Sequence, residues 1–300
     1  MVEVKTNSLK AWVLAARPKT LTGAAVPVMM ALSMAFVDGG CEAFRILPAL
    51  LCFLFAFIMQ IDANFINDYF DFQKGTDDEH RLGPRRACAQ GWVTQRAMQR
   101  AINITTSVAC LIGLPLVIYG GWWTVVIGAA CVIFCFLYTI YLSYRGLGDL
   151  LVLVFFGLVP VCATYYLQTG TVKADVIVAS VASGLVIDTL LVVNNYRDRD
   201  NDRRTGKHTL VVLMGEKWSE ALYLALGLIA FLLGLVHLSN GRYMTFLLPL
   251  LYVLLHTHTF WRMKKIHQGK ALNQILGITA RNIFIFGLLF SAGILIDGLA

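Results

Sequence analysis

Two polar stretches, each placed directly after a long apolar run, carry the residues of this chain that could do chemistry. The first follows the apolar run 46–61 and reads Asn-Phe-Ile-Asn-Asp-Tyr-Phe-Asp from Asn64 to Asp71. In a helix Asn64, Asn67 and Asp71 share one face, because they are spaced i, i+3 and i+7. Asp68 flanks that face. Such polar groups at the edge of a hydrocarbon layer are costly, and their usual reason is function.

The second stretch follows the apolar run 176–193 and reads Asn-Asn-Tyr-Arg-Asp-Arg-Asp-Asn-Asp from Asn194 to Asp202. Asn194, Asp198 and Asp202 are spaced i, i+4 and i+8, which again places them on one helical face. Both stretches contain the element Asn-x-x-x-Asp. Their ligand atoms are all oxygens, which suit Mg²⁺ better than zinc or copper. Two such helix ends facing each other need cations, most simply Mg²⁺ carrying a diphosphate.

Basic and aromatic side chains near the two stretches fit the same chemistry. Lys74, Arg197 and Lys207 could bind a diphosphate, although cytoplasmic loops of membrane proteins are generally rich in such residues. Loss of diphosphate from an allylic substrate leaves a carbocation, which needs shelter from water and electron-rich walls. Tyr138 and Tyr141 share a helix face and are our candidates for that wall. Interfacial anchoring is the alternative role for these rings.

The elements that must position these residues are membrane helices. The chain has 300 residues, of which 58% are hydrophobic and only 14% are charged, against about 25% charged in a soluble domain. About nine apolar runs are long enough to span a bilayer, which predicts an all-α polytopic membrane protein made of one domain, 1–300. We expect spans at Leu21–Phe36, Ile46–Ile66, Ala101–Ile118, Trp122–Tyr141, Leu147–Leu167, Val176–Val193, Ala221–Leu238, Met244–Phe260 and Ile275–Leu299. Polar loops are expected at Tyr69–Arg100 and Tyr196–Lys217.

The distribution of basic residues predicts how the chain is oriented in the membrane, and the order of the spans predicts an internal repeat. Most of the 25 lysines and arginines fall in alternate loops, which predicts a cytoplasmic N-terminus and an external C-terminus. The net charge of +7 therefore reflects the bilayer rather than nucleic acid. Four spans separate the two acidic stretches, so we expect two four-helix units plus a ninth helix around a central cavity. The seven cysteines show no paired spacing, and we predict no structural disulfide.

Four stretches of this sequence resemble the UbiA-type intramembrane prenyltransferase superfamily, over nearly the whole chain. Two of them point to its 1,4-dihydroxy-2-naphthoate branch. In that branch Gly75 stands where the wider superfamily has a third Asp, and Asp77 follows two residues later. The stretches are Arg17 to Leu21, Asn67 to Asp77, Tyr144 to Asp149 with Phe155 to Gly157 and Tyr165 to Gly170, and Asn194 to Leu210.

The resemblance implies a reaction and roles for residues. A polyprenyl group would pass from its diphosphate to 1,4-dihydroxy-2-naphthoate, with loss of CO₂ and diphosphate, giving demethylmenaquinone in a bacterial inner membrane. It implies that Mg²⁺ is held by Asn67, Asp71, Asp198 and Asp202. It also implies that Asp68 orients or assists catalysis and that Lys207 binds diphosphate. Arg145 is our candidate partner for the acceptor carboxylate, because a guanidinium matches a carboxylate in geometry.

Other functions fit the same pattern less well. Another aromatic acceptor, such as 4-hydroxybenzoate or a porphyrin, would need the same two acidic stretches. Cyclisation or hydrolysis of the diphosphate would need no acceptor. A transporter of cations or lipid phosphates would fit the helix count and the repeat. Transport sites tend to lie near the middle of the membrane, however, whereas both acidic stretches fall at one face.

Overall fold

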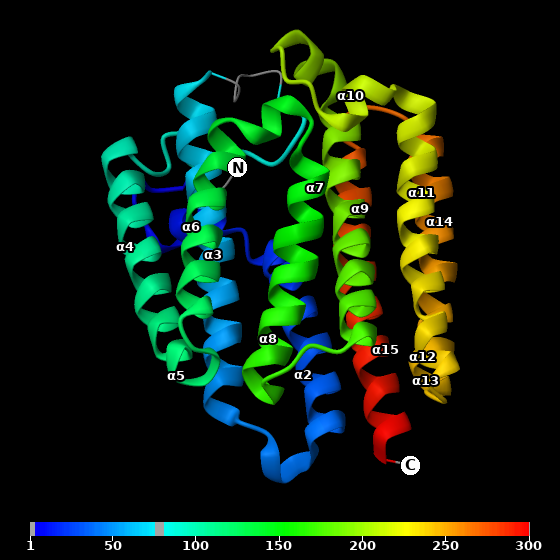
Figure 1. The fold of residues 1–300 in the computed structure, drawn as a ribbon. Helices are drawn as coiled ribbons and strands as arrows, with labels where there is room; N and C mark the ends of the chain where they lie inside the picture. The colour runs from blue at the N-terminus through cyan, green and yellow to red at the C-terminus, as the bar shows by residue number, and fades with distance from the viewer. Residues whose placement is uncertain (1–3, 76–80, 300) are drawn as a thin grey trace.

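The computed structural model describes residues 4–75 and 81–299, and every regular element in these two ranges is helical (Figure 1). Nine helical segments of this described part are long and apolar enough to cross a membrane, as the sequence predicted. They are Leu9–Ala43, Ile46–Gln73, Gln95–Gly120, Trp123–Ile140, Gly148–Thr169, Ala174–Arg204, Glu216–Ser239, Tyr243–Ile266 and Leu272–Leu299.

Several of these segments are interrupted by short turns, so they contain more than one element. The elements in chain order are α1 (Leu9–Ala16), η1 (Pro18–Thr20), α2 (Leu21–Ala43), α3 (Ile46–Gln73), α4 (Gln95–Gly113), η2 (Leu114–Leu116), α5 (Val117–Gly120), α6 (Trp123–Ile140), η3 (Leu142–Arg145), α7 (Gly148–Val152), the π-helical turn η4 (Leu153–Leu158), α8 (Val159–Thr169), α9 (Ala174–Arg204), α10 (Leu210–Met214), α11 (Glu216–Leu233), α12 (Leu235–Ser239), α13 (Tyr243–Leu247), α14 (Leu250–Ile266) and α15 (Leu272–Leu299).

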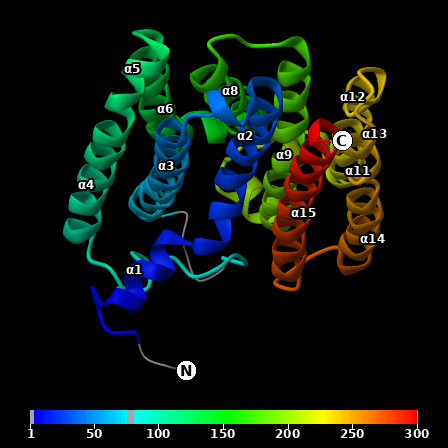
Figure 2. The same ribbon diagram turned by 90° about the horizontal axis from the view of Figure 1, so that it is seen from below.

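The helices form the two predicted four-helix units with a ninth helix beside them. Helices α2, α3, α4 and α6 make the first unit, in which α3 packs against α2, α4 and α6. The second unit contains α8, α9, α11 and α14, with α9 at its centre. Helix α15 packs along α2, α9 and α14 and so joins the units, as the view from below shows (Figure 2).

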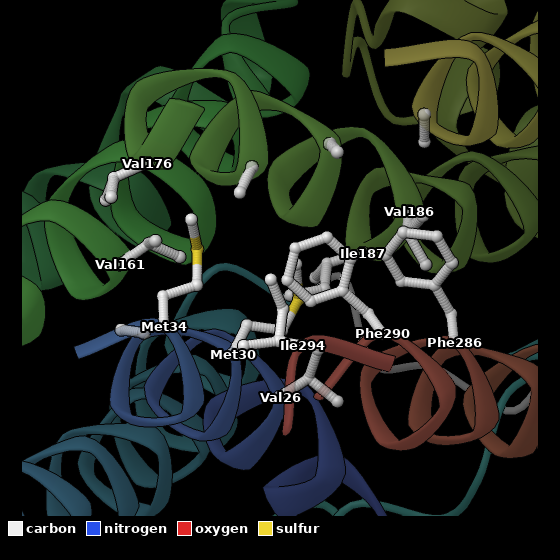
Figure 3. Packing of buried hydrophobic residues seen from close by; sticks show 14 of the residues in the cluster. Val26, Met30, Met34, Val161, Val176, Val186, Ile187, Phe286, Phe290 and Ile294 are labelled. Atoms are coloured by element: carbon white, nitrogen blue, oxygen red, sulfur yellow. The ribbon is translucent and has the colours of Figure 1, made fainter. Parts of the chain in front are cut away.

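The main hydrophobic core lies where the two units meet. Val26, Met30 and Met34 of α2 form one cluster with Phe286 and Phe290 of α15 and with side chains of α8 and α9; Met34 points toward Val161 and Val176 (Figure 3). This core holds α2, α9 and α15 together over most of their lengths. All seven cysteines lie in the described ranges and are free.

Both acidic stretches lie inside helices, which corrects the expected loop boundaries at Tyr69 and Tyr196. Helix α3 continues to Gln73 and ends where Gly75 takes a φ of 69°, a conformation that favours glycine at a helix C-terminus. Helix α9 continues to Arg204, and the arginines of its last turn face the negative end of the helix dipole. The sequence suggested a loop because these turns are polar. Regular helix instead fixes the spacing of their side chains.

Candidate active site

The two acidic helix ends lie at the same end of the bundle, hereafter the motif end (Figure 1). Their carboxylates share neighbours. The charges of Lys207 and Arg81 act on both Asp71 of α3 and Asp202 of α9. Tyr138 of α6 also lies within electrostatic reach of both carboxylates. The structure therefore brings the two stretches together around common cations, as the sequence predicted.

The side chains of Asn67 and Asp71 both have protein partners at this meeting point. Asn67 Oδ1 accepts a hydrogen bond of 2.6 Å from the Thr139 hydroxyl at the end of α6. One oxygen of Asp71 lies 3.3 Å from Arg86 Nη2. Hydrogen bonds of this kind orient a metal ligand. Helix α6 thus sets the direction of the first acidic stretch.

Asp68 and Asn64 position the backbone around the site. Asp68 is 1% exposed, and its two oxygens accept hydrogen bonds from the backbone N–H groups of Ala87 and Cys88 at 2.9 and 2.8 Å. It anchors the loop that follows the first stretch, in line with the predicted orienting role. Asn64 lies a turn deeper, where its amide donates to the Ala16 carbonyl at 2.9 Å. This bond ties α3 to the end of α1, so the structure gives Asn64 a positioning contact.

A buried arginine organises the second stretch. Arg197 is 2% exposed, and its guanidinium donates to both oxygens of Asp198 at 2.8 and 2.5 Å. It also donates to Asn194 Oδ1 and to Asn273 Oδ1, both at 2.9 Å. These bonds engage Nε, Nη1 and Nη2, so Arg197 holds protein groups where the sequence suggested a substrate contact. Asn194 is accordingly tied to Arg197, whereas one buried oxygen of Asp202 has no hydrogen-bond partner.

Positive charge surrounds the acidic side chains. Lys74 Nζ donates to the carbonyls of Thr139 and Ile140 at 3.2 and 2.6 Å and lies 4.0 Å from the centre of the Tyr144 ring. Lys207 Nζ lies 5.7 Å from the centre of the same ring. Burial lowers the pKa of Lys74; the charge of Asp71 opposes that shift and Lys207 adds to it. The two predicted lysines therefore stand side by side next to the first stretch.

Three arginines that the sequence did not single out as site residues join them. The charges of Arg81 and Arg17 act on Asp71, and Arg86 forms the ion pair already described. The run of basic residues between Arg81 and Arg86 was the sequence feature that could have indicated them. Because the run lies in a long loop, the sequence did not show toward which part of the molecule these side chains point. Asp77 lies outside the described residues.

The structure places the two candidate tyrosines in different surroundings. Tyr138 lies beside Gly148 of α7 and within reach of the acidic side chains. Tyr141 is exposed, and Arg145 stacks on its ring with 3.8 Å from the guanidinium carbon to the ring centre. Among the described residues, no hydrogen bond or ion pair joins Arg145 to either acidic stretch. Of the two candidate tyrosines, Tyr138 is the one that lies within electrostatic reach of both acidic stretches.

The donor set fits a hard divalent cation. Asn67, Asp71, Asp198 and Asp202 offer only oxygen atoms, and the orphaned Asp202 oxygen is a buried acceptor that a cation would satisfy. The cations around Asp71 match the excess negative charge of a metal-bound diphosphate. A membrane-embedded helical bundle with this site at one end is the architecture of an enzyme that acts on lipid diphosphates.

Comparison with known proteins agrees with that class. The chain belongs to the UbiA prenyltransferase family, whose model matches residues 24–293. It is 38% identical over 227 residues to the 1,4-dihydroxy-2-naphthoate octaprenyltransferase of Escherichia coli, covering 72% of each chain. It is 31% identical to the protein of the same name from Haemophilus influenzae, covering 97% of each chain.

Solved structures show the same fold. The apo structure of a UbiA homolog from Aeropyrum pernix superposes with a TM-score of 0.67 at 16% identity, covering 91% of this chain and 97% of that one. A UbiA homolog from Archaeoglobus fulgidus, solved bound to GPP and Mg²⁺, gives a TM-score of 0.66 at 11% identity, covering 94% and 99%. At these identities the likeness concerns the fold.

Proposed function

We propose that this protein transfers a polyprenyl group from a polyprenyl diphosphate to 1,4-dihydroxy-2-naphthoate, releasing CO₂ and diphosphate and giving demethylmenaquinone. The observation that carries the proposal is the meeting of the two acidic helix ends around shared cations. The relatives named as octaprenyltransferases of this acceptor, which match most of the chain, support the choice of acceptor.

Asn67, Asp71, Asp198 and Asp202 would hold Mg²⁺. The bound metal supplies charge that neutralises the departing diphosphate and so favours its release. Lys74, Lys207 and Arg81 bind the remaining phosphate oxygens, because their charges gather beside the same carboxylates. Arg197 keeps Asp198 in place rather than contacting the substrate. The guanidinium already donates four hydrogen bonds to protein groups, which favours that role.

Tyr138 presents its electron-rich ring to the allylic cation. Its position next to both α7 and the acidic stretches supports this role. The role of Arg145 as partner of the acceptor carboxylate is left out of this proposal, because Arg145 is exposed and stacks on the ring of Tyr141.

The motif end faces the cytoplasm of a bacterium in this proposal, with the N-terminus inside and the C-terminus outside. The positive loops at that end support it, because such loops are retained on the cytoplasmic side. A water-soluble acceptor and a water-soluble diphosphate product can then exchange with the cytoplasm, while the isoprenoid tail stays in the bilayer.

The test is a conversion assay with the purified protein in lipid nanodiscs. Mg²⁺, a series of polyprenyl diphosphates and equal amounts of 1,4-dihydroxy-2-naphthoate and 4-hydroxybenzoate are supplied together, and products are identified by mass. The expected result is a prenylated naphthol whose mass is lower by one CO₂ than that of the prenylated naphthoate. Its formation should depend on added Mg²⁺. Preference for the benzoate would move the chain to another acceptor, and movement of ligand across vesicles without conversion would favour transport.

A further inference from the structure

A second acidic pair lies deeper in the bundle than the motif residues. Asp149 begins α7 and Asp188 lies in the middle of α9, and the charge of Asp149 acts on Asp188. Asp188 is 5% exposed. Each of the two side chains has one buried carboxylate oxygen to which no group in residues 4–75 and 81–299 donates a hydrogen bond. Such groups are costly in a membrane interior and call for a functional reason.

The packing of α9 against the segment α7–η4–α8 sets the two carboxylates face to face. A Cβ at Gly157 would lie 2.5 Å from the Ser180 carbonyl oxygen, and one at Gly184 would lie 3.0 Å from Leu153 Cα. These contacts pair Gly157 with Ser180 and Leu153 with Gly184, so one helical turn back along the first segment corresponds to one turn forward along α9. A further turn in the same sense pairs Asp149 with Asp188. The small side chains at this crossing therefore fix the pair.

Tyr138 connects this pair with the motif end. The charges that act on its hydroxyl group belong to Asp149, Asp71, Asp188 and Asp202. A Cβ at Gly148, next to Asp149, would lie 3.8 Å from that hydroxyl oxygen. Tyr138 thus lies within electrostatic reach of both the pair and two of the proposed metal-binding carboxylates.

Distance separates the pair from the metal. Asp188 and Asp198 are ten residues apart on one helix, an axial rise of about 15 Å. That rise is too long for Asp188 to join Asp198 on one ion or on two bridged ions. A pair at that distance from the metal-binding residues is placed to act on the acceptor rather than on the diphosphate.

We propose that Asp149 and Asp188 share one proton and act together as the group that takes up, and then returns, the proton of the acceptor hydroxyl next to the prenylated carbon. Two adjacent carboxylates away from water repel each other, so one proton held between them is the stable arrangement. A shared-proton pair has one vacant basic site and one acid, which suits a proton that must leave and come back. This inference rests on the proposed function.

The chemistry balances without another reactant. The acceptor carbon that bears the carboxylate forms a bond to the allylic carbon, and the allylic carbon–oxygen bond breaks with its electrons leaving on diphosphate. The neighbouring hydroxyl gives its proton to the acid pair and becomes a ketone. The β-keto carboxylate then loses CO₂, and the electrons of the broken carbon–carbon bond form the enolate. The pair returns its proton to the enolate oxygen, so no net proton is gained or lost.

The first test is kinetic, on purified Asp149→Asn and Asp188→Asn in nanodiscs. We expect kcat for naphthoate prenylation to fall by about 10²-fold or more, the usual contribution of a positioned acid or base. Binding of an unreactive thiodiphosphate analogue of the donor with Mg²⁺ should stay within about threefold, because the motif residues bind it. Turnover within threefold of wild type in either variant would overturn the proposal.

Asp62→Asn is the matched control. Asp62 is also a fully buried carboxylate in a membrane helix, but its oxygens accept hydrogen bonds from Thr105 and Thr106 at 2.5 and 2.7 Å. Its replacement should alter stability and leave kcat per folded molecule within about twofold. An equal loss of kcat in this variant would show that any buried charge lost from the bundle gives the effect, and would refute a specific role for the pair.

The second test needs no acceptor and separates this inference from the proposed function. Infrared difference spectra of the purified protein in H₂O and D₂O report the C=O stretch of a protonated carboxyl group. We expect a band that is present in wild type and in Asp188→Glu and is lost in Asp188→Asn and Asp149→Asn. If wild type fails to prenylate the naphthoate, the proposed function fails, and this band still decides whether the pair shares a proton. Spectra identical in wild type and both Asn variants would rule the shared proton out.

Discussion

The two ends of the helical bundle treat their carboxylates in opposite ways. At the end away from the motifs, Asp38 of α2 accepts hydrogen bonds from Tyr165, Arg242 and Lys173 at 2.6, 2.6 and 2.9 Å. Asp297 accepts three more from the backbone and hydroxyl of a single turn. At the motif end the carboxylates differ among themselves: both oxygens of Asp68 and of Asp198 accept hydrogen bonds, whereas Asp202 keeps a buried oxygen to which none of the described residues donates.

The difference separates carboxylates that stabilise the fold from carboxylates that are available to bind ligands. A carboxylate whose lone pairs are filled by protein donors stabilises the contacts among those donors. One that keeps an empty acceptor in a buried site pays a desolvation penalty that only a ligand removes. Asp38 joins α2, α8 and α13 through its donors, whereas Asp202 and the pair Asp149–Asp188 retain acceptors for substrates and metal. The same substitution should therefore give opposite results at the two ends.

The largest effect is expected for Asp71→Asn. Removing one carboxylate from the metal-binding set should lower prenyl transfer by about 10³-fold at limiting Mg²⁺, since a metal-held diphosphate depends on that charge. Thermal unfolding in detergent should change little, because the amide oxygen that replaces the carboxylate can still accept the hydrogen bond from Arg86. The measurement is initial rate against Mg²⁺ concentration beside a melting curve. Wild-type turnover at limiting Mg²⁺ would remove Asp71 from the metal site.

A smaller effect is expected for Thr139→Val, which deletes the hydroxyl bonded to Asn67. Loss of such an orienting hydrogen bond typically weakens metal affinity by about 10- to 100-fold. Rates at saturating Mg²⁺ should recover most of their wild-type value, and a titration of activity with Mg²⁺ measures the shift. Thr106→Val is a control in the same size class, because its hydroxyl bonds Asp62 outside the site. Equal shifts in both variants would contradict an orienting role for Thr139.

Asp38→Asn should reverse the pattern seen for Asp71. The substitution removes the charged acceptor of Lys173 and one of the two charged acceptors of Arg242, which keeps Asp175 at 3.3 Å, and the expected loss is about 2 kcal/mol in the free energy of unfolding. Activity per folded molecule should stay within about twofold. Equilibrium unfolding in mixed detergent micelles measures the first quantity and initial rates the second. Glu42→Gln, an exposed carboxylate nearby, should change neither, and a loss of activity without a loss of stability would break the comparison between the two ends.

The smallest effect is expected for Arg145→Gln. Arg145 is exposed and stacked on Tyr141, so its removal should change KM for the acceptor by less than about threefold, in line with a surface cation–π contact. Acceptor titration at saturating donor is the measurement. A rise of tenfold or more would restore Arg145 as the partner of the acceptor carboxylate and would place part of the acceptor site nearer the cytoplasmic surface.

The sequence predicted the number of spans and the meeting of the two acidic stretches, because apolar run length and polar helix ends are both local signals. It did not predict which polar residues face inward. The family resemblance gave Asp71 to the metal and an orienting role to Asp68, but the sequence did not show that Asp68 binds two backbone N–H groups of a distant loop. Arg197 looked free to bind substrate because its partner Asn273 lies far away in the chain.

Asp149 and Asp188 illustrate a signal that was present and passed over. Each is a lone acidic residue in an apolar segment, which already suggests function in a membrane. Their significance emerges only when the glycine crossing of α8 and α9 places them opposite each other. Pairing across helices depends on packing, and a single sequence does not reveal packing.

The hydrogen bond from Arg197 to Asn273 has a consequence for the order in which the site is assembled during synthesis. Asn273 stands at the start of α15, and it also donates to the Leu82 carbonyl in the loop after the first acidic stretch. One amide on the ninth helix therefore ties together parts of the chain that the ribosome releases much earlier. A nascent chain with eight helices inserted lacks this tie between the second acidic stretch and the loop that follows the first.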